Sequence, residues 1–273
     1  MSEFLAQMAR SSRERLEQAR RLRPHGELER AARAVAPAPA LRLTGFDLIA
    51  ELKLRSPAQG QLGAAGEDVA ARVAGYARAG AAAVSVLTEP ERFDGSLGHL
   101  AEAARVLAPL GVPAMRKDFL VDPYQVLEAR AAGAGGVLVI LRMLARAEIG
   151  ALIACARELE MFVLLEAFDE ADIEVLHELV AEPRGAQLLT GVNCRDLATL
   201  EVVPGRLLEL APRLPASVPR VAESGVASAA DARAVAAAGY QLALVGSALM
   251  GQSDPAALAS RLLAAGRAAA RGA

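Results

Sequence analysis

The chain has 273 residues, 53% of them hydrophobic, and a formal net charge of -2, which excludes a general attraction to nucleic acid or to anionic membranes. Aromatic residues make up 3% of the chain and tryptophan is absent, which argues against a platform for stacking bases. No apolar run approaches the ~18 residues of a membrane span, the amino terminus has no apolar signal core, and Cys155 and Cys194 lack metal-ligand spacing. We therefore expect a soluble cytoplasmic protein with free thiols.

The first 46 residues read as a helical extension. Residues 3–22 are rich in Arg, Glu, Gln and Ala with spaced apolar residues, which predicts an amphipathic helix that Pro24 ends or bends. A second short helix is expected over residues 27–35. The segment that follows contains two prolines and reads as a connector into the first strand.

From residue 47 the pattern becomes regular. Apolar segments of strand length alternate with helical segments that often end at glycine. The expected strands are 48–52, 81–87, 111–115, 136–141, 161–167, 187–193, 218–224 and 241–246. Eight βα units of this kind predict an α/β fold, a single (β/α)8 TIM barrel over residues 47–273. The alternative is a doubly wound open sheet, but the first turn, SPAQGQLG, lacks the glycine fingerprint of that fold.

Glu51 and Lys53 lie at the end of the first expected strand, which is otherwise apolar. Because side chains alternate along a strand, both point to the same side as Ile49. A buried charge is costly unless it is paired or used. These two charges therefore indicate either a self-contained ion pair or one part of an active site.

Polar residues also end several later strands. By the same alternation, one polar side chain per strand points inward at a similar level; these residues are Lys117, Glu166, Asn193 and Glu223. Active sites of (β/α)8 barrels lie at the carboxyl ends of the strands. Any one of these residues could be a structural polar group, but acids and bases gathered at one place favour general acid–base chemistry.

The last two expected strands end in small residues, Ser224-Gly225 and Gly246-Ser247. Small residues let backbone N–H groups approach an anion, and barrels commonly bind phosphate in these loops. Two ordinary glycine turns are the alternative. No Cys/His/Asp cluster suggests a metal, and His25, His99 and His177 are expected to be surface residues.

Several segments together resemble one known family. They are IAELKLRSP, SVLTEPERFDGS, RKDFLVDPYQVLEARAAGA, LLEAFDE, GVNCRDLATLEV, VAESGV and LVGSALM. In these motifs the chain is similar to the indole-3-glycerol-phosphate synthase family of tryptophan biosynthesis, from about residue 48 to residue 250. The resemblance implies ring closure of 1-(2-carboxyphenylamino)-1-deoxyribulose 5-phosphate, with loss of CO2 and water and without a metal or cofactor. It implies a small phosphorylated substrate as partner. A barrel of this kind can be monomeric and the sequence has no obvious apolar seam, so we expect a monomer or weak homo-oligomer.

The resemblance also implies roles for residues at the strand ends. Lys117 is the general acid that starts ring closure, Glu166 its acid–base partner in dehydration, and Lys53 binds the substrate carboxylate. The residues that orient the substrate and the lysines are Glu51, Asn193 and Glu223. The residues that pack on the aromatic ring are Phe93, Phe119 and Leu138. Those that hold the phosphate or shape the site beside it are Ser56, Ser224, Gly225, Gly246, Ser247 and Arg195.

Four positions depart from the pattern of the family: Leu54, Ala58, Arg142 and Phe168. A basic residue, a serine, a small residue and a histidine, respectively, are common there. None of these changes removes an implied catalytic group. Other hypotheses remain: a paralogue with an altered phosphosugar or anthranilate-derived substrate, a phosphosugar isomerase, or a phosphometabolite-binding barrel without catalysis.

Overall fold

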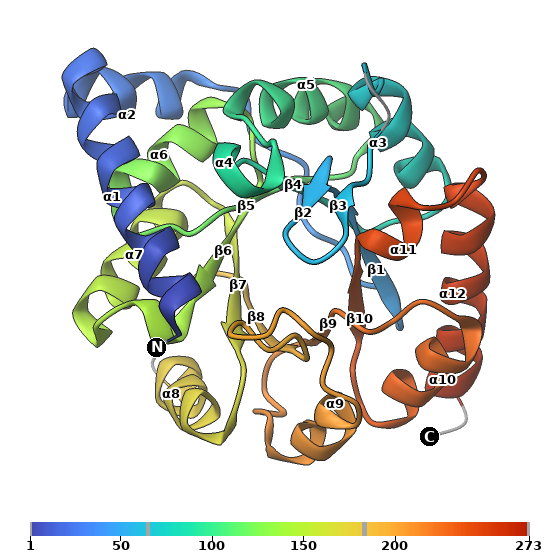
Figure 1. Ribbon diagram of the computed structural model, residues 1–273. Coiled ribbons are helices and arrows are strands. Elements are labelled where there is room, and N and C mark those ends of the chain that lie inside the picture. Colours follow the sequence, from blue (N-terminus) through green and yellow to red (C-terminus); the bar gives the residue numbers. More distant parts are fainter. Residues whose placement is uncertain (1, 64–65, 182–184, 272–273) are drawn as a thin grey trace.

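Eight parallel strands close into a barrel in the computed structural model, which describes residues 2–63, 66–181 and 185–271 (Figure 1). The strands are β1 (Asp47–Leu52), β4 (Ala83–Leu87), β5 (Ala114–Lys117), β6 (Gly136–Ile140), β7 (Phe162–Ala167), β8 (Leu188–Asn193), β9 (Arg220–Glu223) and β10 (Leu242–Val245). Around the barrel they follow the order β1-β10-β9-β8-β7-β6-β5-β4. The predicted (β/α)8 barrel is confirmed.

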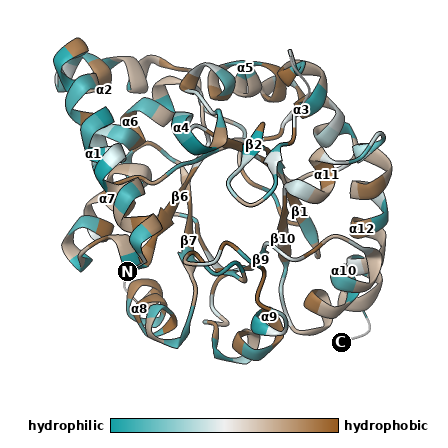
Figure 2. Ribbon diagram, viewed as in Figure 1, coloured by the Kyte–Doolittle hydropathy of each residue, from teal (hydrophilic) through white to brown (hydrophobic). Residues whose placement is uncertain are grey.

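Helices surround the strands and follow them in the chain (Figure 1). Those of the barrel are α3 (Val69–Arg78), α5 (Leu97–Leu107), α6 (Pro123–Ala131), α7 (Arg146–Glu158), α8 (Glu170–Ala181), α9 (Arg206–Leu210), α10 (Ala229–Ala237) and α12 (Pro255–Ala270). Two short helices and three 3-10 turns lie in the loops: α4 (Pro90–Phe93), α11 (Ser247–Met250), η1 (Ala108–Leu110), η2 (Leu141–Met143) and η3 (Ala211–Arg213). A small hairpin follows β1: β2 (Arg55–Ser56) and β3 (Gly60–Gln61). The strands are mostly hydrophobic, whereas the helices carry both hydrophobic and hydrophilic residues (Figure 2).

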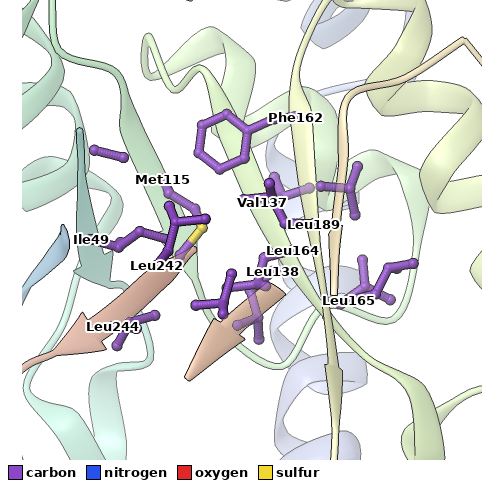
Figure 3. Packing of buried hydrophobic residues seen from close by; sticks show 14 of the residues in the cluster. Ile49, Met115, Val137, Leu138, Phe162, Leu164, Leu165, Leu189, Leu242 and Leu244 are labelled. Carbon is purple, nitrogen blue, oxygen red and sulfur yellow. The ribbon is translucent and has the colours of Figure 1, made fainter. Parts of the chain in front are cut away.

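Apolar side chains fill the barrel beneath its carboxyl end (Figure 3). Strand register places them in layers, with Leu138 beside Leu164 and Leu164 beside Leu189. Phe162 lies one layer closer to the amino ends of the strands than Leu164. Its partner in register is Gly136, where only glycine fits, because a Cβ there would lie 2.3 Å from the Phe162 ring. Other fully or nearly buried members of this inner packing are Ile49, Met115, Leu242 and Leu244. A packed interior leaves ligand binding to the strand ends.

Some element boundaries differ from those predicted. The strand expected at 111–115 is β5, which begins at Ala114 and continues to Lys117. It starts late because Gly111, with φ 70°, turns the chain out of η1. Among the helices, α3 begins at Val69 because the Asp68 side chain caps it by accepting from Ala71 N–H. Local caps therefore set boundaries that periodicity alone places less sharply.

Two helices, α1 (Glu3–Leu22) and α2 (His25–Ala34), precede the barrel and lie along its α6 and α7 side (Figure 1). Asp118, just after β5, anchors α1: its carboxylate accepts from both terminal nitrogens of Arg15 at 3.0 and 2.8 Å. The same carboxylate accepts from Arg116 at 3.0 Å and from the Thr88 hydroxyl at 2.7 Å. The Tyr124 hydroxyl adds hydrogen bonds to backbone carbonyls at the end of α1. The extension is thus tied directly to the carboxyl end of β5.

None of the helices in the described ranges is long and apolar enough to cross a membrane.

Candidate active site

A cavity of ≈ 340 Å³ opens at the carboxyl ends of the barrel strands. All but one of the residues predicted for the site line it: Glu51, Lys53, Ser56, Phe93, Lys117, Phe119, Glu166, Asn193, Arg195, Glu223, Ser224, Gly225, Gly246 and Ser247. They come from distant parts of the sequence and meet because parallel strands end at the same rim.

Leu138 is the exception. It is fully buried and pairs in register with Leu164, one layer beneath the polar side chains. Ile140, two residues further along β6, is in register with Glu166 and lines the cavity instead. Leu138 therefore lies beneath the cavity wall and Ile140 lies at it, because residues two apart on a strand share a face but occupy successive layers. Its contact with the aromatic ring of a substrate stays a prediction.

Two ion pairs face the cavity. Lys53 Nζ lies 2.9 Å from Glu51 Oε1 within β1 and its continuation, and Lys117 Nζ lies 3.2 Å from Glu166 Oε2 across the barrel rim. The glutamates are almost completely buried, whereas both lysine side chains keep some exposure to the cavity. The ion pair considered for Glu51 and Lys53 thus exists, and it exists inside the cavity as one part of a polar ring. Each ammonium group can reach a ligand without leaving its carboxylate.

Burial and neighbouring charges set the protonation of this ring. Burial alone would lower the pKa of Lys117, but the carboxylates of Glu166, Glu223 and Glu51 hold that pKa above its ordinary value. Burial and the negative charge of Glu166 raise the pKa of Glu223 well above its usual range, against the opposing effect of Lys117. No donor group in the described part of the chain reaches either carboxyl oxygen of Glu223, and the carboxyl group of Glu166 is its neighbour in the ring. The ring therefore contains a charged ammonium donor beside a carboxyl group that favours its neutral form.

Two glycines make room for buried carboxyl groups. A Cβ at Gly191 on β8 would lie 2.1 Å from Glu223 Oε1, and a Cβ at Gly246 after β10 would lie 2.2 Å from Glu51 Oε1. Both distances are far below any tolerated contact. Gly246 was predicted for its access to an anion, and close packing against Glu51 gives it a second physical reason.

The rim beyond β8, β9 and β10 offers free hydrogen-bond donors. The Asn193 side-chain oxygen accepts from the Ser224 hydroxyl and from Arg195 N–H, both at 2.9 Å. Ser224 and Gly225 have φ values of 66° and 74°, a left-handed turn. The backbone N–H groups of Gly225 and Ser247 donate to none of the described residues, and the buried Ser247 hydroxyl has no partner among them. Free donors at neighbouring loop ends form a suitable site for a phosphate group.

An aromatic wall forms the other side of the cavity. The rings of Phe93 and Phe119 lie 6.1 Å apart between centroids. Phe4, at the start of α1, meets Phe119 edge-on at 6.0 Å and also lines the cavity. Sequence reasoning missed Phe4, because its helical spacing with Met8 indicates an apolar face but not what that face covers. The wall can pack against an aromatic ring of a ligand.

The hairpin β2–β3 places the first loop over the cavity. Ser56 and Ala58 line the cavity, whereas the partly buried Leu54 packs against the apolar core. The Ser56 hydroxyl accepts from Ala58 N–H at 3.3 Å. The departure at residue 54 therefore lies outside the cavity, and the one at residue 58 lies at its wall.

The closed barrel, the paired acids and bases and the free donors define the class of the protein as a (β/α)8-barrel enzyme for a phosphorylated substrate. The sequence model of indole-3-glycerol phosphate synthase matches residues 5–262. The chain belongs to the indole-3-glycerol phosphate synthase family, whose members are decarboxylating lyases of tryptophan biosynthesis.

Individual relatives support the same assignment. The chain is 45% identical over 226 residues to indole-3-glycerol phosphate synthase of Parafrankia sp., which covers 83% of this chain and 81% of the relative. It is 43% identical over 242 residues to the enzyme of the same name from Mycobacterium leprae, covering 87% and 85%. The range that the family model matches includes all eight strands of the barrel and the polar ring.

More distant solved structures share the fold alone. The 3-hexulose-6-phosphate synthase of Salmonella typhimurium aligns with a TM-score of 0.62 at 16% identity, over 82% of this chain and 100% of that one. Thiamine phosphate pyrophosphorylase of Pyrococcus furiosus aligns with a TM-score of 0.57 at 17% identity, over 82% and 96%.

Proposed function

We propose that the cavity is where this chain converts 1-(2-carboxyphenylamino)-1-deoxyribulose 5-phosphate to indole-3-glycerol phosphate, CO2 and water. The observation that carries the proposal is the Lys117–Glu166 pair, which lies between a rim of free donors and an aromatic wall. The substrate has a phosphate, a carboxylate and an aromatic ring, and the cavity offers a partner for each. Family membership supports the reaction, and the geometry supports the roles that follow.

Lys117 begins the reaction as the general acid. Its ammonium group donates a proton to the carbonyl oxygen of the substrate while the ring carbon that bears the carboxylate attacks the carbonyl carbon. The new carbon–carbon bond forms, and loss of CO2 restores the aromatic ring. The raised pKa keeps Lys117 charged at neutral pH, so the proton is present when substrate binds.

Dehydration completes the pyrrole ring. The hydroxyl formed in the first step leaves as water after it is protonated, and the methylene carbon between the ring nitrogen and the former carbonyl carbon loses a proton, which forms the carbon–carbon double bond of the new ring. Glu166 serves as the acid–base partner of Lys117 in this step, since the two groups already share a hydrogen bond of 3.2 Å. Glu223, held towards its neutral form, and Glu51 orient the lysines and the substrate.

The remaining contacts fix the substrate in place. Lys53 binds the carboxylate before it is lost, and Phe93 and Phe119 pack on the aromatic ring. The phosphate lies at the far rim, where its partners are Ser56, Ser224, Gly225, Gly246 and Ser247, with Asn193 and Arg195 shaping the wall beside them. Because the phosphate and the aromatic ring are bound at opposite sides of the cavity, the reacting atoms of the substrate are held next to Lys117. This lowers the entropic cost of ring closure.

The direct test is turnover. Purified protein is mixed with the substrate, without added metal or nucleotide, and indole fluorescence is followed. We expect turnover in the wild type and loss of most of it in Lys117→Ala. The far-ultraviolet circular dichroism spectrum of the variant should match that of the wild type, which shows that the fold is kept. Turnover near the wild-type rate in Lys117→Ala would contradict the role of Lys117. Calorimetric binding without turnover in the wild type would favour a phosphometabolite-binding barrel instead.

We also propose that the chain acts in the cytoplasm as a monomer or weak homo-oligomer. Composition and the barrel, which places the whole cavity within one chain, support this proposal. Light scattering across a range of protein concentrations tests it. A constant mass corresponding to a stable oligomer would contradict it.

A further inference from the structure

Two of the residues that depart from the family pattern lie in direct contact. Arg142, in η2 after β6, places its guanidinium over the ring of Phe168, 4.6 Å from the ring centre. Phe168 follows β7 and is nearly buried, with 3% of its surface exposed. A guanidinium at this distance is attracted to the face of the ring. The two departures therefore form a single interaction between neighbouring loops.

Two acidic side chains complete the contact. Arg142 donates to Asp172 Oδ2 from Nε at 2.9 Å and from Nη2 at 2.5 Å, and Nη2 also lies 2.7 Å from Asp169 Oδ2. Asp172 Oδ2 accepts at 2.8 Å from the backbone N–H of Phe168 as well. One carboxylate thus holds the guanidinium and the backbone after β7 at the same time.

The position of this cluster links it to the polar ring. Ile140 and Glu166 are partners in register on β6 and β7, and both line the cavity. Arg142 lies two residues beyond Ile140, and Phe168 lies two residues beyond Glu166. The cluster therefore joins the two loops directly above the layer that contains the Glu166 carboxylate, while none of its members lines the cavity.

We infer that Arg142, Phe168 and Asp172 are positioning residues, which fix the end of β7 so that Glu166 stays within hydrogen-bond distance of Lys117. The inference rests on the proposed catalytic role of Glu166. The cluster acts by restricting the backbone of residues 166–168: stacking holds the side chain of Phe168, and Asp172 holds its N–H. Small displacements of a reacting group cost much of the rate, so a fixed strand end has a kinetic consequence.

Arg146 supplies a matched control. It lies at the start of α7 and contacts α8, through an ion pair of 2.8 Å with Glu178 and a hydrogen bond to the Val175 carbonyl. Its partners lie further along α8, away from the strand ends. Both arginines thus join the segment between β6 and β7 to α8, and a variant at Arg146 removes one such link without touching the end of β7.

The experiment compares Arg142→Met with Arg146→Met by steady-state kinetics on the carboxyphenylamino sugar phosphate. We expect kcat to fall about 10- to 100-fold in Arg142→Met with KM unchanged, because the change displaces a catalytic group without removing a binding contact. Arg146→Met should keep the wild-type kcat. Arg142→Lys, which keeps the charge but not the forked donors, should recover part of the loss.

The same substitution made in a protein that already carries Glu166→Gln distinguishes positioning of Glu166 from general structural support. If Arg142 acts through Glu166, Arg142→Met causes no further loss of kcat when it is added to Glu166→Gln. An equal loss in both backgrounds, or a wild-type kcat in Arg142→Met, would overturn the inference. Should Arg142→Met fail to fold, Phe168→Leu takes its place, since it removes the stack but keeps the ion pair; a wild-type kcat there would also overturn it. Absence of turnover in the wild type would instead contradict the proposed function, and the inference with it.

Discussion

The ammonium nitrogen of Lys117 lies 3.2 Å from Oε2 of Glu166, although β6 separates the two strands that carry these residues. One hydrogen bond thus spans three adjacent strands at the barrel rim. The distance is possible because both long side chains point into the same cavity. A proton can pass between these two groups without the movement of either backbone.

Glu166→Gln tests whether this pair acts as a unit. We expect kcat to fall about 10²- to 10⁴-fold, the usual contribution of a positioned acid–base group. The double variant Lys117→Ala/Glu166→Gln should lose little more than Lys117→Ala alone, because groups that act together are not additive. Rates are measured by indole fluorescence, and thermal unfolding of each variant serves as the control. A loss of kcat in the double variant equal to the product of the two single losses would show that the two residues act in independent steps.

Gly191→Ala should distort the polar ring. The added Cβ would lie 2.1 Å from Glu223 Oε1, so the carboxyl group or the strand must move. We expect a loss of about 1–3 kcal/mol in the free energy of unfolding, as for other overpacked sites, together with a lower kcat. Gly75→Ala is the control: Gly75 lies in α3 with open space around its Cβ position and should gain about 0.5–1 kcal/mol. Urea denaturation measures both. A stability of Gly191→Ala equal to that of the wild type would contradict the close contact.

Asp118→Asn should weaken the link between α1 and β5. Burial alone would raise the pKa of Asp118, but Arg116, Arg15 and the Thr88 hydroxyl hold it well below its ordinary value of 3.8. The stability contributed by such a carboxylate is complete above pH 3.8 and is lost as the pH falls below it. At neutral pH we expect the variant to lose about 3–5 kcal/mol, because Arg15 and the buried Arg116 lose the carboxylate that they share.

Thermal unfolding as a function of pH measures this effect. As the pH falls below 3.8, the midpoint of the wild type should drop towards that of Asp118→Asn. Arg20→Gln is the control, because it breaks a 2.8 Å pair with Asp122 between α1 and the same loop at an exposed site, worth about 0–1 kcal/mol. A constant difference between wild type and Asp118→Asn across the acid range would contradict the lowered pKa.

Phe4→Ala should weaken substrate binding. The ring lies 6.0 Å from that of Phe119 and forms part of the cavity wall. Loss of an aromatic contact worth about 0.5–1.5 kcal/mol predicts a rise in KM of about two- to tenfold, with kcat unchanged. Leu22→Ala on the same helix is the control, since this side chain is 87% exposed. Equal KM values for the two variants would show that the substrate does not contact the wall near Phe4.

Much of the fold could be predicted from consecutive residues. Alternation of apolar strand segments with helical segments is a local pattern, and repeated units of that kind have few ways to close. The same alternation predicts that four polar side chains point to the inner face of the barrel: Lys117, Glu166, Asn193 and Glu223. Boundaries were less accurate, as at β5, because single turns and caps set them.

The candidate site was predictable as a set of residues but not as a geometry. Strand parity gives the direction of a side chain and not its layer, so it does not reveal that Leu138 lies beneath the cavity and that Ile140 lines it. The layer depends on the stagger of neighbouring strands around the closed barrel. The raised pKa of Glu223 likewise follows from burial beside Glu166, which no property of the strand β9 alone reveals.

The sequence by itself therefore determined the barrel, the polar ring at its rim and the family, because each depends on the order of residues along the chain. Only the tertiary structure brought Phe4 to the cavity wall and placed Arg142 over Phe168. Those contacts join segments that are separated irregularly along the chain, so no periodic pattern in the sequence indicates them. They depend on how helices and loops pack around the closed barrel, where burial and distance decide which side chains meet.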